Sequence, residues 1–396
     1  MRIPILLAML AILFNSFTQL RILSLGIGIG ELFGMSALIS AAINQQKIYI
    51  NYTILLLLSG YFFGLLIGTI NNELMGGISI ISIRELFAVI YAVSISLLLA
   101  TYIKKDFNVF INFLLVFDTI IISHISVIVL PFMGIDFPYW MGDTQEETVS
   151  APLSFNGRFV GLAQNPHQIG ILLTTYFMFM FVKRGEGRLY KLFHILATVA
   201  AVALILLIKS TTLIFVYTVI TLVCLILIFK RLKIVTKFFA AFLLFIFCAL
   251  TYVYVEAFFI DILTNDGKSD ASGRFGLWEN ALRAVLEANF LGLGPGSHTG
   301  YTRPYEGTEA HNVFLDILMQ GGVLSLFFYL FIYISTFIRN LKNKYILWAL
   351  VLVALMLSQM SGYFLRNIFA WIPIFIALVW SSSHQNSLKM YFNNKS

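Results

Sequence analysis

The chain has 396 residues, of which 59% are hydrophobic and only 11% are charged, and its mean hydropathy is +0.89. Because an ordinary soluble domain has roughly 25% charged residues, this composition indicates an integral membrane protein. The apolar runs recur from end to end and do not alternate with polar residues. They therefore predict helices and exclude a barrel. Both cysteines lie inside such runs, which excludes a disulfide framework.

Hydropathy predicts an all-α polytopic fold with about twelve transmembrane helices in a single integral membrane domain, residues 1–396. The first span is expected to be retained, because no small-x-small cleavage site follows it. The predicted spans are 4–18, 22–43, 49–70, 79–102, 108–134, 167–182, 190–208, 211–229, 236–258, 312–338, 345–363 and 367–382.

The net charge is +7, and its distribution indicates an orientation. With the N-terminus in the cytoplasm, the predicted inner segments carry most of the 26 basic residues. This bias predicts a multi-pass protein of a bacterial inner membrane with both termini in the cytoplasm. The inner charges are scattered over short loops without a contiguous basic stripe, so nucleic acid is excluded as a partner.

Two predicted periplasmic loops, 134–166 and 259–310, are too long to be simple connectors. Both mix aromatic residues, glycines and isolated arginines, a composition that favours function over disorder. The larger loop contains a predicted amphipathic helix near 275–289, followed by a glycine cluster that ends it. The residues predicted to share its apolar face are Trp278, Ala281, Leu282, Val285 and Leu286.

Several isolated cations are predicted on the outer side. Arg274 is expected at the start of the amphipathic helix, with Asp270 outside it. The helix dipole disfavours a cation there by about 0.3–1 kcal/mol, but a guanidinium and exposed amides can hold an anion together. Arg283 has Glu279 and Glu287 one turn away and is interpreted as a surface ion pair. Four further cations are predicted on this side: Arg158, Lys209, Arg366 and Arg84. Taken singly, each is explained by anchoring to lipid headgroups or by a local ion pair. If some of them converge, they would favour a phosphate or diphosphate site.

Three histidines are predicted on the outer side, at His167, His298 and His311, and their spacing fits no metal motif. His311 directly precedes a span, and a histidine titrates near neutrality, so it is suited to accept a proton. Asn312 is a weaker candidate for orienting it. Gly321-Gly322 is predicted to allow another helix to approach closely.

Three motifs carry a resemblance to a known family: GRFVGLAQNP in the first loop, GRFGLWENAL followed by FLGLGPGS in the second, and AHNVFLDILMQGGVLS at the next span. The chain resembles the O-antigen polymerases and O-antigen ligases, membrane glycosyltransferases that act on undecaprenyl-diphosphate-linked glycans. The resemblance implies a GT-C-like arrangement of about twelve helices. Arg274 and His311 match the family's essential arginine and histidine, and Arg158 matches its other outer-loop arginine.

The chain departs from the ligase pattern at three positions. Trp278 stands where ligases typically have leucine, and Ser325 where they have glycine, threonine or tyrosine. Thr211 follows Ser210 where the family often has Ser-Arg, and Lys209 is a candidate replacement for that lost cation. These departures favour a polymerase over a ligase by a small margin.

The resemblance implies a polymerase of lipid-linked repeat units that works at the periplasmic face, inverts the anomeric centre and needs neither metal nor cofactor. Arg274 and Arg158 would stabilise the diphosphate leaving group, and His311 would be the general base. The remaining candidates for substrate binding are Asn312, Lys209, Arg84, Arg366 and His167.

The implied partners are an undecaprenyl-diphosphate-linked glycan donor, a lipid-linked glycan or lipid A core acceptor, membrane lipids and a chain-length regulator. Two alternatives stay open. One is an O-antigen ligase that transfers the finished glycan to lipid A core or to protein. The other is a polysaccharide or lipid transporter or flippase, against which stand the missing repeat symmetry and the concentration of candidates on one face.

Overall fold

Helices make up almost all of the part of the chain that this computed structural model describes. Two compact units can be distinguished, and the boundary between them falls inside helix α4 (Ser79–Lys105). Unit 1 comprises Met1–Tyr49, Val93–Ile214 and Ile368–Ser396, and unit 2 comprises Ile50–Ala92 and Phe215–Asn367. The described residues are 3–17, 21–22, 27–48, 50–76, 79–127, 154–155, 158–159, 161–163, 166–180, 188–208, 216, 270–297, 310, 312–342, 349, 352–353, 355–357 and 366–383.

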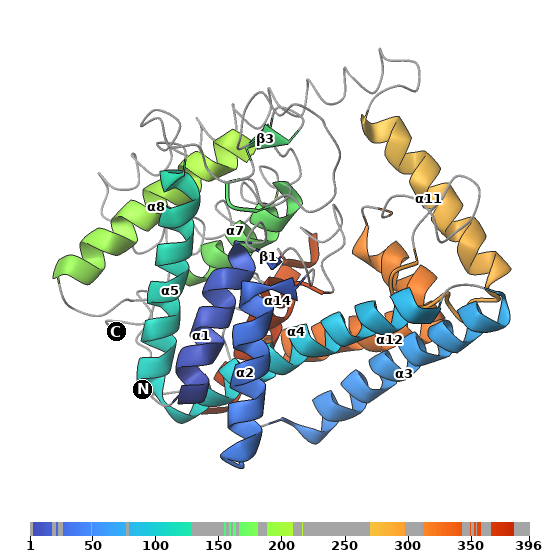
Figure 1. The fold of residues 1–396 in the computed structure, drawn as a ribbon, viewed down its shortest axis with the longest axis horizontal. Helices are drawn as coiled ribbons and strands as arrows, with labels where there is room; N and C mark the ends of the chain where they lie inside the picture. Colours follow the sequence, from blue (N-terminus) through green and yellow to red (C-terminus); the bar gives the residue numbers. More distant parts are fainter. Residues whose placement is uncertain are drawn as a thin grey trace. The chain divides into compact units, whose positions relative to one another are not determined.

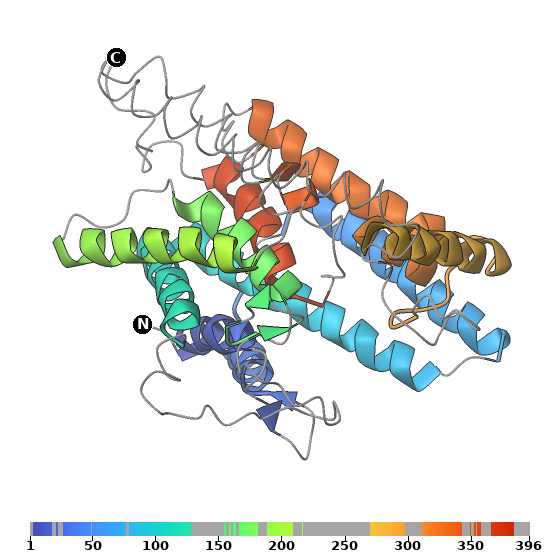
Figure 2. The ribbon, with the colours of Figure 1, turned by 90° about the horizontal axis from the view of Figure 1, so that it is seen from above.

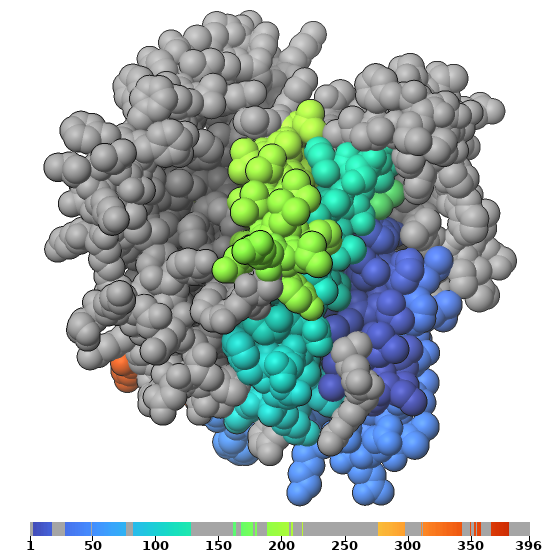
Figure 3. Space-filling model, turned by 90° about the vertical axis from the view of Figure 1, so that its left-hand side faces the viewer, coloured from blue at the N-terminus to red at the C-terminus, as the bar shows by residue number. Residues whose placement is uncertain are grey.

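Unit 1 is built around a core of aromatic side chains. Its elements are α1 (Ile3–Ser16), β1 (Arg21–Ile22), β2 (Ile27–Gly28), α2 (Ile29–Ile43), the second half of α4, α5 (Phe107–Ser126), β3 (Ser154–Phe155), β4 (Arg158–Phe159), α7 (Pro166–Met180), α8 (Arg188–Ile208) and α14 (Ile368–Ser383). Phe117 and Phe179 pack edge to face, with ring centroids 5.5 Å apart, and Phe117 meets Phe369 in the same way at 5.6 Å. These contacts join α5, α7 and α14. On the face shown in Figure 3, α8 lies against α5.

Unit 2 is organised around two long helices that lie side by side, α3 (Tyr52–Leu74) and α12 (Val313–Lys342) (Figures 1 and 2). The first half of α4 belongs to this unit, as does α11 (Asp270–Glu287), which packs on α12.

The prediction of a multi-pass helical membrane protein is confirmed. Within the described residues, five helices are long and apolar enough to cross a bilayer: Tyr52–Leu74, Ser82–Lys105, Phe107–Ser126, Arg188–Ile205 and Val313–Lys342. Three shorter apolar helices are Ile3–Ser16, Ile29–Ile43 and Ile368–Val379. The number of twelve stays a prediction, because the expected spans 211–229, 236–258 and 345–363 lie wholly or largely outside the described residues.

One predicted boundary is wrong. The span expected to begin at residue 22 starts instead with a short hairpin, in which Arg21 pairs with Gly28, and the helix begins at Ile29. The backbone N–H of Gly28 donates to the Glu31 carboxylate at 3.0 Å. This cap stabilises the helix start, and it gives a local role to the carboxylate of Glu31, which lies within the predicted span 22–43.

A four-residue repeat of glycines brings α3 against α12. Gly60, Gly64 and Gly68 face the α12 segment from Gln320 to Phe328, and an added Cβ at Gly64 would lie 2.3 Å from the Ser325 Oγ. The Ser325 hydroxyl donates to the Tyr61 carbonyl at 2.8 Å. Small residues at this spacing let two helix backbones approach closely, which is how transmembrane helices associate. The prediction for Gly321 is therefore confirmed, and its partner helix is α3.

Candidate active site

The central feature of unit 2 is a break in α12 at Gly322, where φ is 67° and ψ is −170°. In an unbroken helix the Met319 carbonyl would accept from the Val323 N–H. Here Met319 O accepts from Leu293 N at 2.8 Å, and Val323 N donates to Phe290 O at 3.1 Å. Backbone groups at membrane depth must be paired within the protein. The segment after α11 supplies that pairing at the break.

This segment, residues 288–297, is named the glycine loop. Its glycines 292, 294 and 296 have φ values of 89°, 83° and 84°, so the predicted helix end is confirmed. The Gly294 N–H donates to the Gln320 carbonyl at 2.8 Å. From α3, the Asn71 side-chain amide donates to Ala288 O at 3.3 Å and to Gly292 O at 2.8 Å. The glycine loop is thus bonded to both long helices of the unit.

The substitution Gly322→Ala forces a side chain into a left-handed conformation, which alone costs about 1–3 kcal/mol. The folded protein is expected to be destabilised by more than this amount. The new Cβ would also lie 2.2 Å from the Phe290 carbonyl oxygen. The matched control is Gly276→Ala, on α11, where a Cβ meets nothing within 4 Å. That change is expected to be neutral or to stabilise by about 0.5–1 kcal/mol. Thermal unfolding of the purified variants would measure both, and equal midpoints would contradict the role assigned to Gly322.

The face of α11 that packs on α12 consists mainly of small residues. Its buried members, together with neighbours from the glycine loop, from α12 and from the residue Ala310 before α12, are Ala281, Ala284, Val285, Ala288, Leu293, Ala310 and Met319. Of the predicted apolar face, Ala281 and Val285 are buried in this packing, whereas Leu282 and Leu286 are 48% and 61% exposed and do not contribute to it. Alanines permit the closer approach, so the leucines of the same helix point away from α12.

The start of α11 also differs from the expectation. The helix begins at Asp270, so Asp270 is its first residue and Arg274 stands one turn inside, four residues later. The Arg274 side chain lies outside the described part. The predicted surface pair of Arg283 with Glu279 is present, with both side chains about two-thirds exposed. The Arg283 guanidinium is consequently paired with Glu279 on the exposed side of α11.

Hydrogen bonds fix the chain at the start of α12. The Asn312 side chain accepts from Phe314 N at 3.1 Å and from Leu315 N at 3.4 Å, and so caps the helix. The Ala310 N–H donates to the buried Asp316 carboxylate at 3.1 Å. The Ala310 carbonyl accepts from the Trp278 indole N–H of α11 at 2.9 Å. His311 itself lies outside the described residues, but the residues on both sides of it are held.

These contacts give structural roles to two residues. The Oδ1 atom of the Asn312 side chain caps α12, and the orientation of His311 by Asn312 stays a prediction because His311 lies outside the described residues. Trp278, a departure from the ligase pattern, bonds α11 to the residue before His311. Asp316 and Asn71 were not predicted from the sequence. The only feature of the sequence that distinguishes them is that each is a polar residue near the end of an apolar helix.

The first predicted loop contributes Arg158 in unit 1. Arg158 lies on β4, in register with Phe155 of β3, and its side chain is outside the described part. Three residues later the chain turns at Gly161, where φ is 54°. The Leu162 N–H then donates to Nδ1 of the buried His124 at 3.1 Å. The hairpin that carries Arg158 is thereby anchored to the end of α5.

The structure describes some of the remaining predicted substrate-binding residues. Arg366 bonds both carboxylate oxygens of Glu85, at 3.0 and 3.2 Å, so Glu85 pairs with Arg366. Arg84 is exposed on α4. His167 follows Pro166 at the start of α7, and Lys209 lies just beyond α8, outside the described residues. Among the residues that the structure describes, no group of three His, Cys, Asp or Glu side chains could hold a metal ion.

Comparison with known proteins gives one family. Residues 195–330 match the sequence model of the family described as O-antigen ligase. The matched segment includes α11, the glycine loop and the first half of α12. No match to a curated protein was found. The predicted resemblance to the O-antigen polymerases and ligases is therefore confirmed, and residues 195–330 carry it.

Proposed function

We propose that this protein is an inverting glycosyltransferase that polymerises undecaprenyl-diphosphate-linked repeat units at the periplasmic face of the inner membrane. The observation that carries the proposal is the family match over residues 195–330, because it includes both Arg274 and His311. The hydrogen bonds of Ala310 and Asn312 support it, since they hold the chain on either side of His311 to α11 and α12.

The reaction requires a general base and a group that stabilises an anion. The bond between the donor sugar and its lipid diphosphate breaks, and the acceptor hydroxyl oxygen bonds to the anomeric carbon from the opposite face. Arg274, assisted by Arg158, stabilises the charge that develops on the departing diphosphate. His311 accepts the proton of the acceptor hydroxyl and later releases it to water. The diphosphate already activates the sugar, so the proposed mechanism requires no nucleotide sugar and no metal.

The anchoring of the glycine loop suits this chemistry. Catalytic groups must be held within about 0.5 Å of the productive geometry by a rigid surround. In unit 2, α11 is attached to α12 through the alanine face, the Trp278 bond and the loop that fills the break at Gly322. We therefore propose that this attachment keeps the positions of Arg274 and His311 fixed relative to each other.

An O-antigen ligase is the second candidate, and the description of the matching family favours it. The active-site chemistry would be the same, with the glycan transferred to lipid A core. We favour the polymerase because Trp278 and Ser325 depart from the ligase pattern and both make hydrogen bonds in this fold.

The glycan profile of a strain lacking the protein separates the two functions. A strain without the polymerase is expected to attach single repeat units to lipid A core, so the ladder of long glycans disappears on a lipopolysaccharide gel. The matched control is the same strain carrying the wild-type gene on a plasmid. Bare core would indicate a ligase instead, and an unchanged ladder would contradict both.

A further inference from the structure

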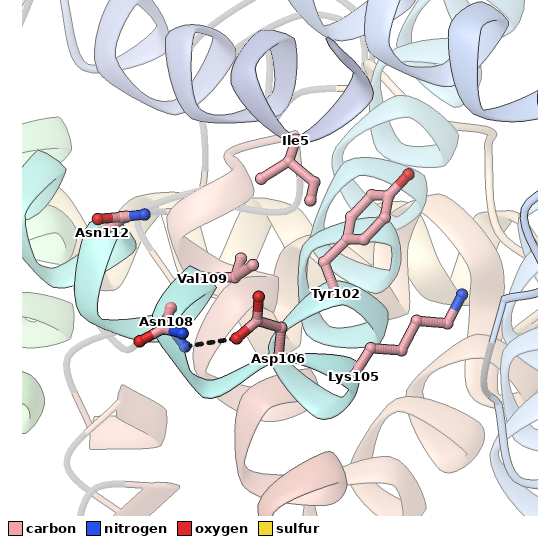
Figure 4. A pocket seen from close by; sticks show the side chains of 7 residues that line it. All are labelled: Ile5, Tyr102, Lys105, Asp106, Asn108, Val109 and Asn112. Atoms are coloured by element: carbon pink, nitrogen blue, oxygen red, sulfur yellow. Dashed lines mark hydrogen bonds between the residues drawn. The ribbon is translucent and has the colours of Figure 1, made fainter. Parts of the chain in front are cut away.

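Unit 1 contains an open pocket at the turn between α4 and α5, with a volume of about 680 Å³. Its lining comes from α1, α4, α5 and the turn itself: Ile5, Tyr102, Lys105, Asp106, Asn108, Val109 and Asn112 (Figure 4). The volume lies in the range of about 300–1,000 Å³ that small-ligand sites occupy.

The position of the pocket indicates what can reach it. The helices on either side, Ser82–Lys105 and Phe107–Ser126, are both long and apolar enough to cross a bilayer, and Asp106 alone separates them. A turn this short between two spans must lie at a membrane surface, at the depth of the lipid headgroups. In the predicted orientation this is the cytoplasmic leaflet.

The lining combines two opposite charges with neutral amides. Lys105 ends α4, and its ammonium donates to Gln46 Oε1 at 3.4 Å and to the Lys47 carbonyl at 3.5 Å and lies 5.9 Å from the centre of the Tyr102 ring. The Asp106 carboxylate accepts the Asn108 backbone N–H at 2.9 Å and so caps α5. Within the described residues Asp106 forms no ion pair, and its side chain is exposed. Figure 4 shows one oxygen of this carboxylate bonded to Asn108 and the other directed toward the side of the pocket where Ile5 lies.

The rest of the lining is mainly apolar, with the hydroxyl of Tyr102 as its polar group. Ile5, Val109 and Tyr102 are 6%, 4% and 3% exposed, so they form a fixed wall. On the same first turns of α1, Ile3 and Leu6 are exposed, which continues an apolar surface next to the pocket. A ligand that suits this site has a positive group, a negative group and an apolar part.

We propose that the pocket binds the zwitterionic phosphoethanolamine headgroup of a membrane phospholipid. Asp106 takes the lipid ammonium, while Lys105, which extends to the other side of Asp106 from Asn108 and Asn112 in Figure 4, binds the phosphate. The glycerol lies against Ile5 and Val109. A purely anionic headgroup fits less well, because the Asp106 carboxylate repels it. The site is independent of the proposed transferase activity.

Lipid retention by the purified full-length protein tests this site. The protein is placed in detergent micelles with equal amounts of phosphatidylethanolamine and phosphatidylglycerol, and retained lipids are counted by native mass spectrometry. Wild type is expected to retain phosphatidylethanolamine preferentially. Lys105→Gln and Asp106→Asn are each expected to lower this retention about tenfold, since each loses a charge-assisted hydrogen bond.

The variants are chosen so that folding is preserved. Asparagine is as good a helix cap as aspartate, so Asp106→Asn keeps the bond to the Asn108 N–H and removes only the charge. The control is Lys104→Gln, which removes a neighbouring cation that does not line the pocket. Preference for phosphatidylglycerol, an equal loss in Lys104→Gln, or displacement of the lipid by equimolar soluble phosphoethanolamine would each overturn the proposal.

Discussion

Replacing His311 with alanine is expected to slow glycan transfer by about 10²–10⁴-fold, because the acceptor hydroxyl loses its general base. The rate is measured with purified protein and undecaprenyl-diphosphate-linked repeat units, by the appearance of dimers and longer products. The loss should appear in kcat with little change in KM for the donor, since a base acts on the acceptor proton and not on donor binding.

Two controls separate this chemistry from damage to the start of α12. His298→Ala removes the other histidine of the same loop and is expected to leave the rate near wild type. Asn312→Asp keeps a side-chain oxygen that can accept from Phe314 N, so α12 stays capped. If His311→Ala retained more than about a tenth of the wild-type kcat, the assignment as base would be wrong, because such a base contributes at least 10²-fold.

The helices of this fold follow from the sequence because lipid leaves the backbone few choices. An apolar run of about 20 residues must pair its own N–H and C=O groups, and a helix does so. The start of α2 could not be found in this way. Hydropathy treats residues 22–43 as one run, whereas the cap from Glu31 to Gly28 and the pairing of Arg21 with Gly28 are local polar interactions.

The surroundings of the candidate site were much harder to predict than its residues. Arg274 and His311 stand in short motifs that can be recognised directly. The break at Gly322 is stabilised by backbone groups about thirty residues earlier in the chain, and the Asn71 bonds to the glycine loop span more than two hundred residues. The periodicity of apolar residues does not indicate hydrogen bonds between such distant parts of the chain. The four-residue spacing of the glycines at 60, 64 and 68 is a sequence signal for the close contact of α3 that was not used in the prediction.

The sequence also does not show which residues of α11 pack on α12. A helical period places Trp278, Ala281 and Val285 on one face, and it cannot decide which neighbours extend that face. The leucines at 282 and 286 look more apolar than the alanines at 284 and 288, so the prediction followed hydrophobicity. The observed packing follows size, because α12 approaches α11 closely at Ala281, Ala284 and Ala288.

Arg274→Ala is expected to lower kcat by about 10²–10³-fold, the usual cost of removing one donor that stabilises a developing anion. Arg274→Lys is expected to recover only part of this loss, because an ammonium cannot bind two phosphate oxygens as a planar guanidinium does. The same transfer assay measures both, and thermal unfolding checks that the variants remain folded.

The matched control for this experiment is Arg283→Ala. Arg283 lies on the same helix, two and a half turns further on, and is exposed in a pair with Glu279. A surface pair of this kind contributes only about 0.3–0.5 kcal/mol, so its loss should leave kcat unchanged. If Arg283→Ala slowed transfer as much as Arg274→Ala, the effect would belong to the helix and not to one guanidinium. A selective loss at Arg274 would instead assign α11 the task of presenting that cation to the diphosphate.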